Sequence, residues 1–163
     1  LFMMNNKSPK SWREKLEKEM RPKVVNVPER WAKRIGHGKM LVPSPLLVDT
    51  VIKRVAKGKL ATVNNIRDYL ADKFNADLSC PLTTGIFINI AAHTAEEDKT
   101  KGKTNITPYW RVLKEGGFLT PKFPGGVKRQ AAYLKQEGFE ILKGKTDDLL
   151  FVKDYSKKIA RFI

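Results

Sequence analysis

The sequence has a single cysteine, Cys80, among its 163 residues. One thiol cannot form a disulfide within the chain, and it excludes a zinc site built from several cysteines. Free cysteine is usually buried and unreactive, and no local feature identifies a base that would activate this one. We therefore interpret Cys80 as a small core residue, and we predict no metal site and no cofactor.

Long apolar runs are also missing. No stretch approaches the roughly 20 apolar residues that a membrane-spanning helix needs, and residues 1–4 are too short for the apolar part of a signal peptide. The hydrophobic content of 41% is nevertheless compatible with an ordered core. We expect a soluble, cytoplasmic and nucleoid-associated protein.

Acidic residues are scarce beside basic ones. The chain has 32 lysines and arginines against 17 aspartates and glutamates, which gives a net charge of +15. This excess predicts a polyanionic partner, because contact with phosphates releases their counterions. No strongly amphipathic segment pairs a basic face with a broad apolar face, so nucleic acid is favoured over a membrane. The plainer alternative is a basic surface that serves only solubility.

Residues 1–43 are interpreted as a basic N-terminal extension. Ser11-Trp12-Arg13-Glu14 fits a capping box, which predicts a short helix over residues 11–20. A second helical turn is expected over residues 28–34. His37 lies between two glycines, and we interpret it as a solvated loop residue.

Residues 44–140 carry the pattern of a helix-turn-helix unit. Ser44-Pro45 is a typical helix start, with serine as the cap and proline in the first turn. Apolar residues at helical spacing follow it. After an extended link over residues 60–63, Asn64 or Asn65 is expected to cap a second helix.

A further helix is expected to begin with Thr83 or Thr84 as its cap. Two helices joined by a short turn suit a helix-turn-helix unit. The polar side of this helix carries small and amide side chains, which can enter a DNA groove. An ordinary solvated helix face is the alternative. The residues expected on that side are Thr84, Asn89, Ala92, His93 and Glu96.

The remaining segments alternate between loops and short elements. Residues 96–107 are polar and lysine-rich, and they predict a mobile loop. Val112-Leu113 and Phe118-Leu119 predict short strands, and residues 127–136 predict a helix. Residues 141–163 are assigned to a C-terminal unit, in which a hairpin formed with residues 139–140 precedes a basic tail.

Several short motifs occur in a characteristic order. Pro108-Tyr109-Trp110-Arg111-Val112 is preceded by residues 55–62 and followed by Gly125-Gly126 and Glu137-Gly138. Over residues 45–138 this order resembles the DNA-binding domain of the alkylguanine-DNA alkyltransferases, which have Pro-Cys-His-Arg-Val, then Gly-Gly, then Glu-Gly. The resemblance implies a winged-helix domain in which residues 81–92 form the DNA-groove helix.

Two departures remove the chemistry of that family. Tyr109 stands at the position of the alkyl-accepting cysteine, and Trp110 stands at the position of its histidine base. A phenol with a pKa of about 10 is a weak nucleophile, and an indole accepts no proton. Glu137 persists at the third position, where we expect it to have no partner to orient. We therefore predict no catalytic residue.

An aromatic residue at the cysteine position is typical of the alkyltransferase-like branch. The resemblance implies a protein that binds alkylated double-stranded DNA and passes the lesion to repair proteins. Tyr109 would then stack on an extruded base, which is worth about 1–3 kcal/mol. The alternative is that Tyr109 and Trp110 fill the vacated space as core. The predicted base pocket consists of Tyr109, Trp110, Val63, Phe123 and Glu137.

Base extrusion has less support than DNA binding. Thr84-Gly85 occupies the place of the family's arginine finger, and Val63 replaces the tyrosine that rotates a phosphate. Extrusion costs a few kcal/mol, and a side chain must fill the gap in the stack. Arg111 is interpreted as either structural or a phosphate contact. The predicted DNA contacts are Thr83, Thr84, Asn89, His93, Arg111, Lys57, Lys59, Lys122, Lys128 and Arg129.

The sequence thus predicts a mainly α protein with small β elements: a winged-helix or helix-turn-helix DNA-binding domain with a basic N-terminal extension. The favoured function is non-enzymatic binding of DNA by a monomer, with recognition of alkylated bases for repair. One alternative is a general nucleic-acid-binding or nucleoid protein without lesion recognition. Another is an enzyme of altered chemistry, in which Cys80 or Tyr109 is the nucleophile.

Overall fold

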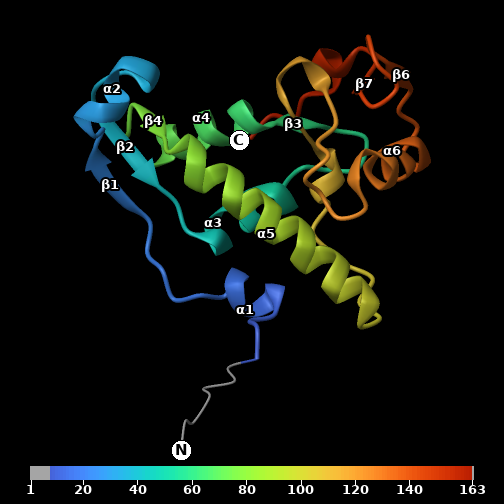
Figure 1. Cartoon of the computed structure of the whole chain (residues 1–163), viewed down its shortest axis with the longest axis horizontal. Coiled ribbons are helices and arrows are strands. Elements are labelled where there is room, and N and C mark those ends of the chain that lie inside the picture. Colours follow the sequence, from blue (N-terminus) through green and yellow to red (C-terminus); the bar gives the residue numbers. More distant parts are fainter. Residues whose placement is uncertain (1–7, 163) are drawn as a thin grey trace, which may run out of the picture.

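A long central helix organises the molecule. The computed structural model describes residues 8–162, and its helix α5 (Pro81–Thr100) crosses the front of the molecule (Figure 1). One end holds α2 (Glu29–Ile35) and the three-stranded sheet β1 (Lys23–Asn26), β2 (Lys39–Val42) and β4 (Leu78–Ser79). The other end holds α6 (Gly126–Gln136) and the hairpin β6 (Ile141–Lys143) and β7 (Leu150–Val152).

The helices α3 (Pro45–Lys53) and α4 (Val63–Lys73) form the unit that packs beneath α5. As predicted, Ser44 caps α3, and its hydroxyl accepts from the Leu47 amide at 3.2 Å. The cap of α4 is Thr62, so the prediction of Asn64 or Asn65 is wrong. Asn65 instead completes a capping box, because its side chain accepts from the Thr62 amide at 2.8 Å.

The helix α5 is longer than the sequence predicts. It begins at Pro81 after Cys80, rather than after Thr83 or Thr84, and it continues to Thr100. The mobile loop predicted from residue 96 is therefore wrong for residues 96–100. Tertiary contacts stabilise these last turns, because the buried Asp98 carboxylate pairs with Arg13 and Lys103.

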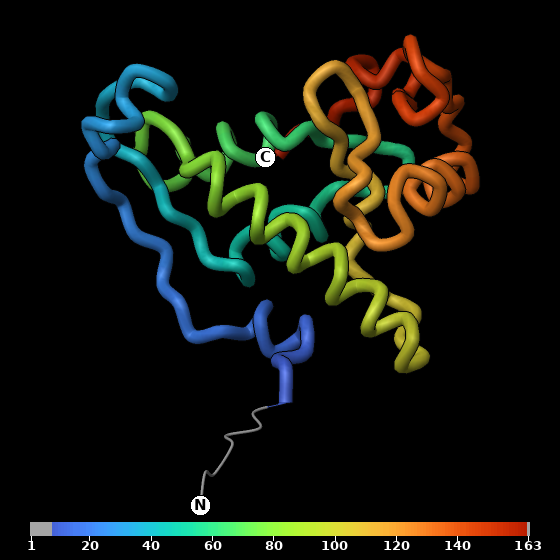
Figure 2. Tube along the Cα trace, viewed as in Figure 1, coloured from blue at the N-terminus to red at the C-terminus, as the bar shows by residue number. Residues whose placement is uncertain are grey.

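The N-terminal segment packs against this unit. Figure 2 follows the chain from α1 (Trp12–Leu16) along one side of the molecule, through α2 and back. Strands β1 and β2 pair in antiparallel fashion, and β2 pairs in parallel with β4, neither of which the sequence predicts. Ser11 caps α1 as predicted, but this helix ends at Leu16, four residues before the expected end.

The Glu97 carboxylate holds α1 against α5. Its two oxygens accept from the backbone amides of Trp12 and Arg13 at 3.0 and 3.1 Å, which satisfies two amides of the first turn of α1. The Trp12 ring stacks on His93 with 4.2 Å between centroids. This contact covers His93, one of the predicted DNA contacts.

The remaining elements agree closely with the sequence. The helices α2 and α6 and the hairpin β6–β7 confirm their predictions to within a residue or two. Strand β5 (Val112–Leu113) also forms, in parallel with β3 (Ala61–Thr62), whereas Phe118 makes only a single bridge to Phe151. Cys80 is buried in a small apolar cluster around Met40, as interpreted from its chemistry.

The mainly helical architecture with small sheets is therefore confirmed. The winged-helix assignment and the division at residues 43 and 140 stay predictions. Between residues 8 and 162, no helix has the length and apolarity to cross a bilayer. That same range has no group of three or more side chains suited to hold a metal ion. The expectation about residues 1–4 lies outside the described range.

We predict that acid loosens the contact between α1 and α5. Burial lowers the pKa of His93; the backbone hydrogen bond with Lys122 opposes this shift and nearby Lys15 adds to it. Because the folded-state pKa lies below the usual value of about 6.5, the unfolded chain binds the proton more readily. The stability that neutral His93 contributes is therefore complete above pH 6.5. It is lost as the pH falls from there through the lower folded-state pKa.

The measurement is the thermal midpoint Tm as a function of pH, with Trp12 fluorescence as a local probe. His93→Gln should flatten the acid side of the profile, whereas His37→Gln, at the exposed loop histidine, should retain it. A wild-type profile in His93→Gln would contradict the prediction.

Candidate nucleic-acid interface

A hollow of about 340 Å³ lies between α5, the start of α4, β5 and the loop of residues 120–123. We call it the α5 pocket. Four of its lining residues stand at positions that the resemblance identifies: Val63, Gly85, Val112 and Phe123. Its volume falls in the range of small-ligand sites, about 300–1,000 Å³. The other lining residues are Pro81, Leu82, Ile86, Ile88, Asn89, Leu113, Lys114, Thr120, Pro121 and Lys122.

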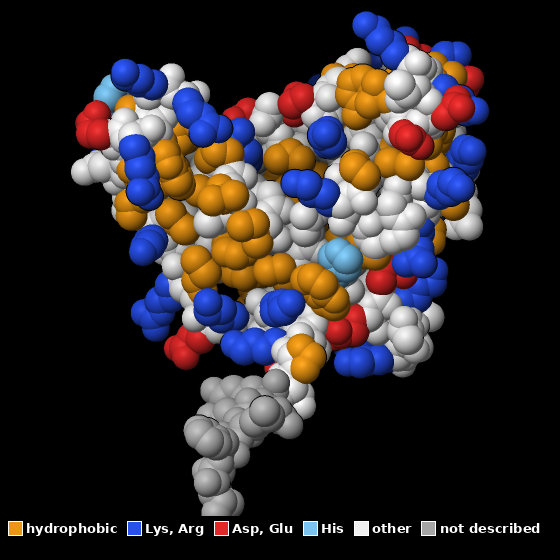
Figure 3. Space-filling view, viewed as in Figure 1, with side chains coloured by type: hydrophobic (Ala, Val, Ile, Leu, Met, Phe, Trp, Pro, Cys, Tyr) orange, Lys and Arg blue, Asp and Glu red, His pale blue; other side chains and the backbone are white. Residues whose placement is uncertain are grey.

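The side of α5 that lines this pocket is largely apolar. Leu82, Gly85, Ile86 and Asn89 follow one another at helical spacing, so they share one face. Leu82 is 59% exposed and Ile86 is 46% exposed, and hydrophobic side chains gather along this face of the molecule (Figure 3). A Cβ atom added at Gly85 would meet nothing within 4 Å.

Two residues predicted on the outward side of α5 are in fact inside. Thr84 is 0% exposed and Ala92 is also buried, because their side of the helix packs on the main core. The expected groove contact by Thr84 is therefore incompatible with its position. Thr83 and Asn89 are half-buried.

Tyr109 is a core residue. It is 0% exposed, and its ring packs edge-on against Phe123 on one side and Trp110 on the other. Its hydroxyl donates to Glu96 Oε1 at 2.7 Å. Burial raises the pKa of Tyr109, and the hydrogen bond and the negative charge of Glu96 raise it further. Of the two interpretations, the structure has the one in which Tyr109 fills the vacated space.

Glu96 connects three parts of the fold. The same Oε1 atom accepts from Tyr133 on α6 at 2.8 Å, and Arg129 Nη1 lies 3.6 Å from Oε2. Tyr133 in turn accepts from Lys99 Nζ at 2.6 Å. The network therefore ties α5 and α6 to Tyr109, and Glu96 is not the solvent-facing residue that the sequence predicts.

Glu137 has two partners, so the expectation that it has none is wrong. It accepts from Trp110 Nε1, and it pairs with Arg111, whose Nη2 lies 2.7 Å from Oε1. Arg111 also donates to the Val55 carbonyl at 2.7 Å, which makes it structural. Neither an indole nor a guanidinium exchanges protons at neutral pH, so this trio holds the fold without acid–base chemistry.

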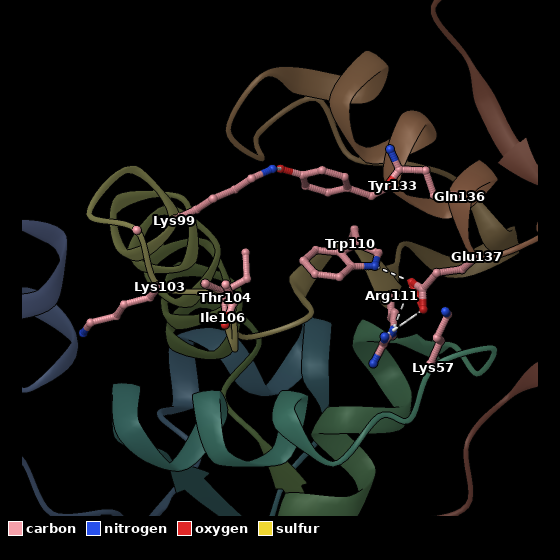
Figure 4. A pocket seen from close by; sticks show the side chains of 11 residues that line it. Lys57, Lys99, Lys103, Thr104, Ile106, Trp110, Arg111, Tyr133, Gln136 and Glu137 are labelled. Carbon is pink, nitrogen blue, oxygen red and sulfur yellow. Dashed lines mark hydrogen bonds and ion pairs between the residues drawn. The ribbon is translucent and has the colours of Figure 1, made fainter.

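A second and larger hollow, of about 740 Å³, lies beside Trp110 (Figure 4). We call it the Trp110 pocket. The predicted base-pocket residues divide between the two hollows: Val63 and Phe123 line the α5 pocket, and Trp110 and Glu137 line the Trp110 pocket. Tyr109 lines neither, because its ring lies between Phe123 and Trp110.

The predicted basic contacts are also dispersed. Lys122 lines the α5 pocket, Lys57 lines the Trp110 pocket, and Lys59 lines another hollow beside the C-terminal tail. Lys128 and Arg129 are exposed on α6. Three residues of the α5 pocket were not predicted from the sequence: Lys114, Leu82 and Ile86. The position of Lys114 directly after the strand β5 could have identified it. Leu82 and Ile86 could not be identified, because apolar residues at helical spacing are interpreted as core although these two are exposed.

The comparison with solved structures defines the class of fold: this chain has the fold of an alkyltransferase-like protein that was solved with DNA. The resemblance drawn from the sequence is to the same class. Among solved structures, the chain is similar to S. pombe ATL in complex with DNA, with a TM-score of 0.53 and 19% identity over 72% of this chain and 94% of that one.

The chain is also similar to S. pombe Atl1 in complex with damaged DNA containing O6-carboxymethylguanine, with a TM-score of 0.52 and 19% identity over the same shares of the two chains. No family profile matches the sequence, and no curated protein matches it.

We predict that the Tyr109 side chain contributes mainly packing. Tyr109→Phe removes the hydrogen bond to Glu96 and should lower the free energy of unfolding by about 1–2 kcal/mol, since Glu96 keeps Tyr133 and Arg129. Tyr109→Ala also leaves a cavity and should cost about 3–5 kcal/mol. Urea unfolding measures both. Equal, small losses in the two variants would show that Tyr109 is not a packing residue.

Proposed function

We propose that this protein binds double-stranded DNA and accommodates an alkylated base in the α5 pocket without transferring the alkyl group. The observation that carries the proposal is the coincidence of Val63, Gly85, Val112 and Phe123 in one hollow on the proposed groove helix. The S. pombe proteins of the same fold, which were solved with DNA, support it.

The absence of alkyl transfer follows from the state of the candidate nucleophiles. Tyr109 is buried, its hydroxyl is engaged by Glu96, and its raised pKa disfavours the phenolate. Cys80 is buried in the small cluster around Met40. A thiolate or phenolate must reach the alkyl carbon to attack it, and neither side chain is open to solvent. The protein therefore acts by binding.

In this proposal the apolar side chains of Leu82 and Ile86 replace the arginine finger that this chain lacks. Proteins that unstack duplex DNA often insert leucine or isoleucine between bases, at a cost of a few kcal/mol per step. Leu82 and Ile86 protrude at the rim of the α5 pocket, beside Gly85. They are placed to fill the gap that an extruded base leaves, and Asn89 on the same face can reach a base edge.

Lysines supply the electrostatic part of binding. Lys114 and Lys122 are exposed at the α5 pocket, where they can contact phosphates on either side of the lesion. The net charge of +15 adds long-range attraction. We also propose that the protein binds as a monomer within the nucleoid and that it passes the lesion to repair proteins.

General nucleic-acid binding is the second candidate. Gly85 and Val63, which replace the family's two flipping residues, favour it, as does the spread of basic residues over several surfaces. In that case a lesion adds nothing to the affinity, and binding depends only on salt.

We predict that the protein prefers alkylated DNA and that the preference depends on Leu82 and Ile86. Fluorescence anisotropy would compare a duplex containing one O6-alkylguanine with its undamaged counterpart at two salt concentrations. Leu82→Ala and Ile86→Ala should each reduce the preference by about tenfold, equivalent to about 1.4 kcal/mol. Leu149→Ala, at an exposed leucine of the hairpin turn, is the matched control.

Equal affinity of the wild type for both duplexes would replace this proposal with general binding. An unchanged preference in both alanine variants would show that Leu82 and Ile86 do not fill the gap left by the extruded base. The proposal that the α5 pocket holds the alkylated base would remain.

We predict that Gly85→Arg strengthens lesion binding. A Cβ atom at this position meets nothing within 4 Å, and arginine is a better helix former than glycine by about 1 kcal/mol. Thr50→Arg, on the exposed side of α3, adds the same charge elsewhere. Both variants should bind undamaged duplex more tightly at low salt, but only Gly85→Arg should raise the preference for the lesion in the anisotropy assay. Equal preferences would contradict an arginine finger at this position.

A further inference from the structure

The Trp110 pocket has an aromatic wall whose side chains are held in place. The Trp110 and Tyr133 rings lie 4.8 Å apart at 61°, and both line the hollow (Figure 4). Hydrogen bonds to Glu137 and Glu96 fix the polar ends of the two rings. Little side-chain entropy remains to be lost when a flat ligand packs on them. Both residues are only half-buried, so part of each faces the hollow.

Positive charge surrounds this wall. Arg111 and Glu137 neutralise each other, and Lys103 pairs with Asp98 at 3.3 Å. Lys57 and Lys99 are left at the hollow, with no ion pair to a described acidic side chain between residues 8 and 162. The hydrogen bond with Tyr133 raises the pKa of Lys99, so its charge is secure at neutral pH. The hollow therefore suits an anion that also carries a flat ring.

The hollow continues past Trp110. A neighbouring hollow of about 450 Å³ shares Thr104, Ile106, Trp110 and Arg111 with it and adds Lys53 and Asn105. The two together form a groove, which residues 102–106 border. A groove with basic residues along its length and aromatic rings in its wall is typical of proteins that bind single strands.

We propose that this groove, which the proposed function leaves unused, binds an unpaired strand of nucleic acid. A base packs on Trp110 and Tyr133, and its phosphates lie at Lys57 and Lys99. Tyr109 and the core around it separate the groove from the α5 pocket. Binding of a strand here is therefore independent of lesion recognition on α5.

The experiment measures binding of a labelled oligothymidylate of about ten nucleotides, within the usual site size for single strands. The double variant Lys57→Gln/Lys99→Gln removes the two proposed phosphate contacts. Its control, Lys59→Gln/Lys101→Gln, removes two exposed lysines next to them in the sequence that do not line the groove.

The first variant should lose about tenfold or more in affinity, and its salt dependence should fall by about 0.7 per contact. The control should lose less than about twofold. Binding should also quench Trp110 fluorescence, and Trp110→Phe should remove most of the quenching while Trp12 and Trp31 remain. Equal losses in the two lysine variants, or quenching that persists in Trp110→Phe, would overturn the proposal.

Two further arms identify the ligand. Thymidine monophosphate that binds as tightly as the oligonucleotide would mean a free nucleotide and would overturn the assignment to a strand. Polyglutamate that competes equally would mean a purely electrostatic surface. Lesion binding at the α5 pocket and strand binding in the groove can be tested separately. Leu82→Ala and Ile86→Ala should leave oligothymidylate binding unchanged. The Lys57→Gln/Lys99→Gln variant should leave the preference for the alkylated duplex unchanged.

Discussion

One half-buried carboxylate organises the centre of this protein. Glu96 accepts hydrogen bonds from Tyr109 and Tyr133, and a carboxylate withdrawn from water is tolerated only with such partners. The network joins the middle of α5 to α6 and keeps the Tyr109 ring in the interior. The buried ring packs against both Phe123 and Trp110, and these two residues line different hollows where a single pocket was expected.

The two replacements at the reactive motif have the same structural effect, because each donates a hydrogen bond to a carboxylate. Tyr109 brings volume and a hydroxyl that Glu96 accepts, and Trp110 brings an N–H that Glu137 accepts. Each new side chain thus adds a hydrogen bond to a carboxylate that other residues also hold: Glu96 is shared with Tyr133, and Glu137 with Arg111. The motif therefore holds the fold where a nucleophile and a base would act. The proposed recognition then depends on the apolar rim of α5 rather than on the motif itself.

Elements with local signals were predictable from the sequence. The Ser44 cap of α3, the period of α6 and the turn of the β6–β7 hairpin all lie within a few residues of what they determine. The parallel pairing of β2 with β4 joins segments that are distant in the sequence, so no local pattern predicts it. The last turns of α5 depend on α1, and the outward face of α5 was misjudged because its exposed residues are leucine and isoleucine.

The docking of α1 has a geometric consequence for any duplex lying along α5. Trp12 covers His93, so the open part of the helix runs only from Leu82 to Asn89. Seven residue steps at 1.5 Å span about 10 Å, which corresponds to about three base-pair steps of B-form DNA. For a duplex bound as proposed, the stacking of Trp12 on His93 would limit the contact of α5 to a lesion and its immediate neighbours.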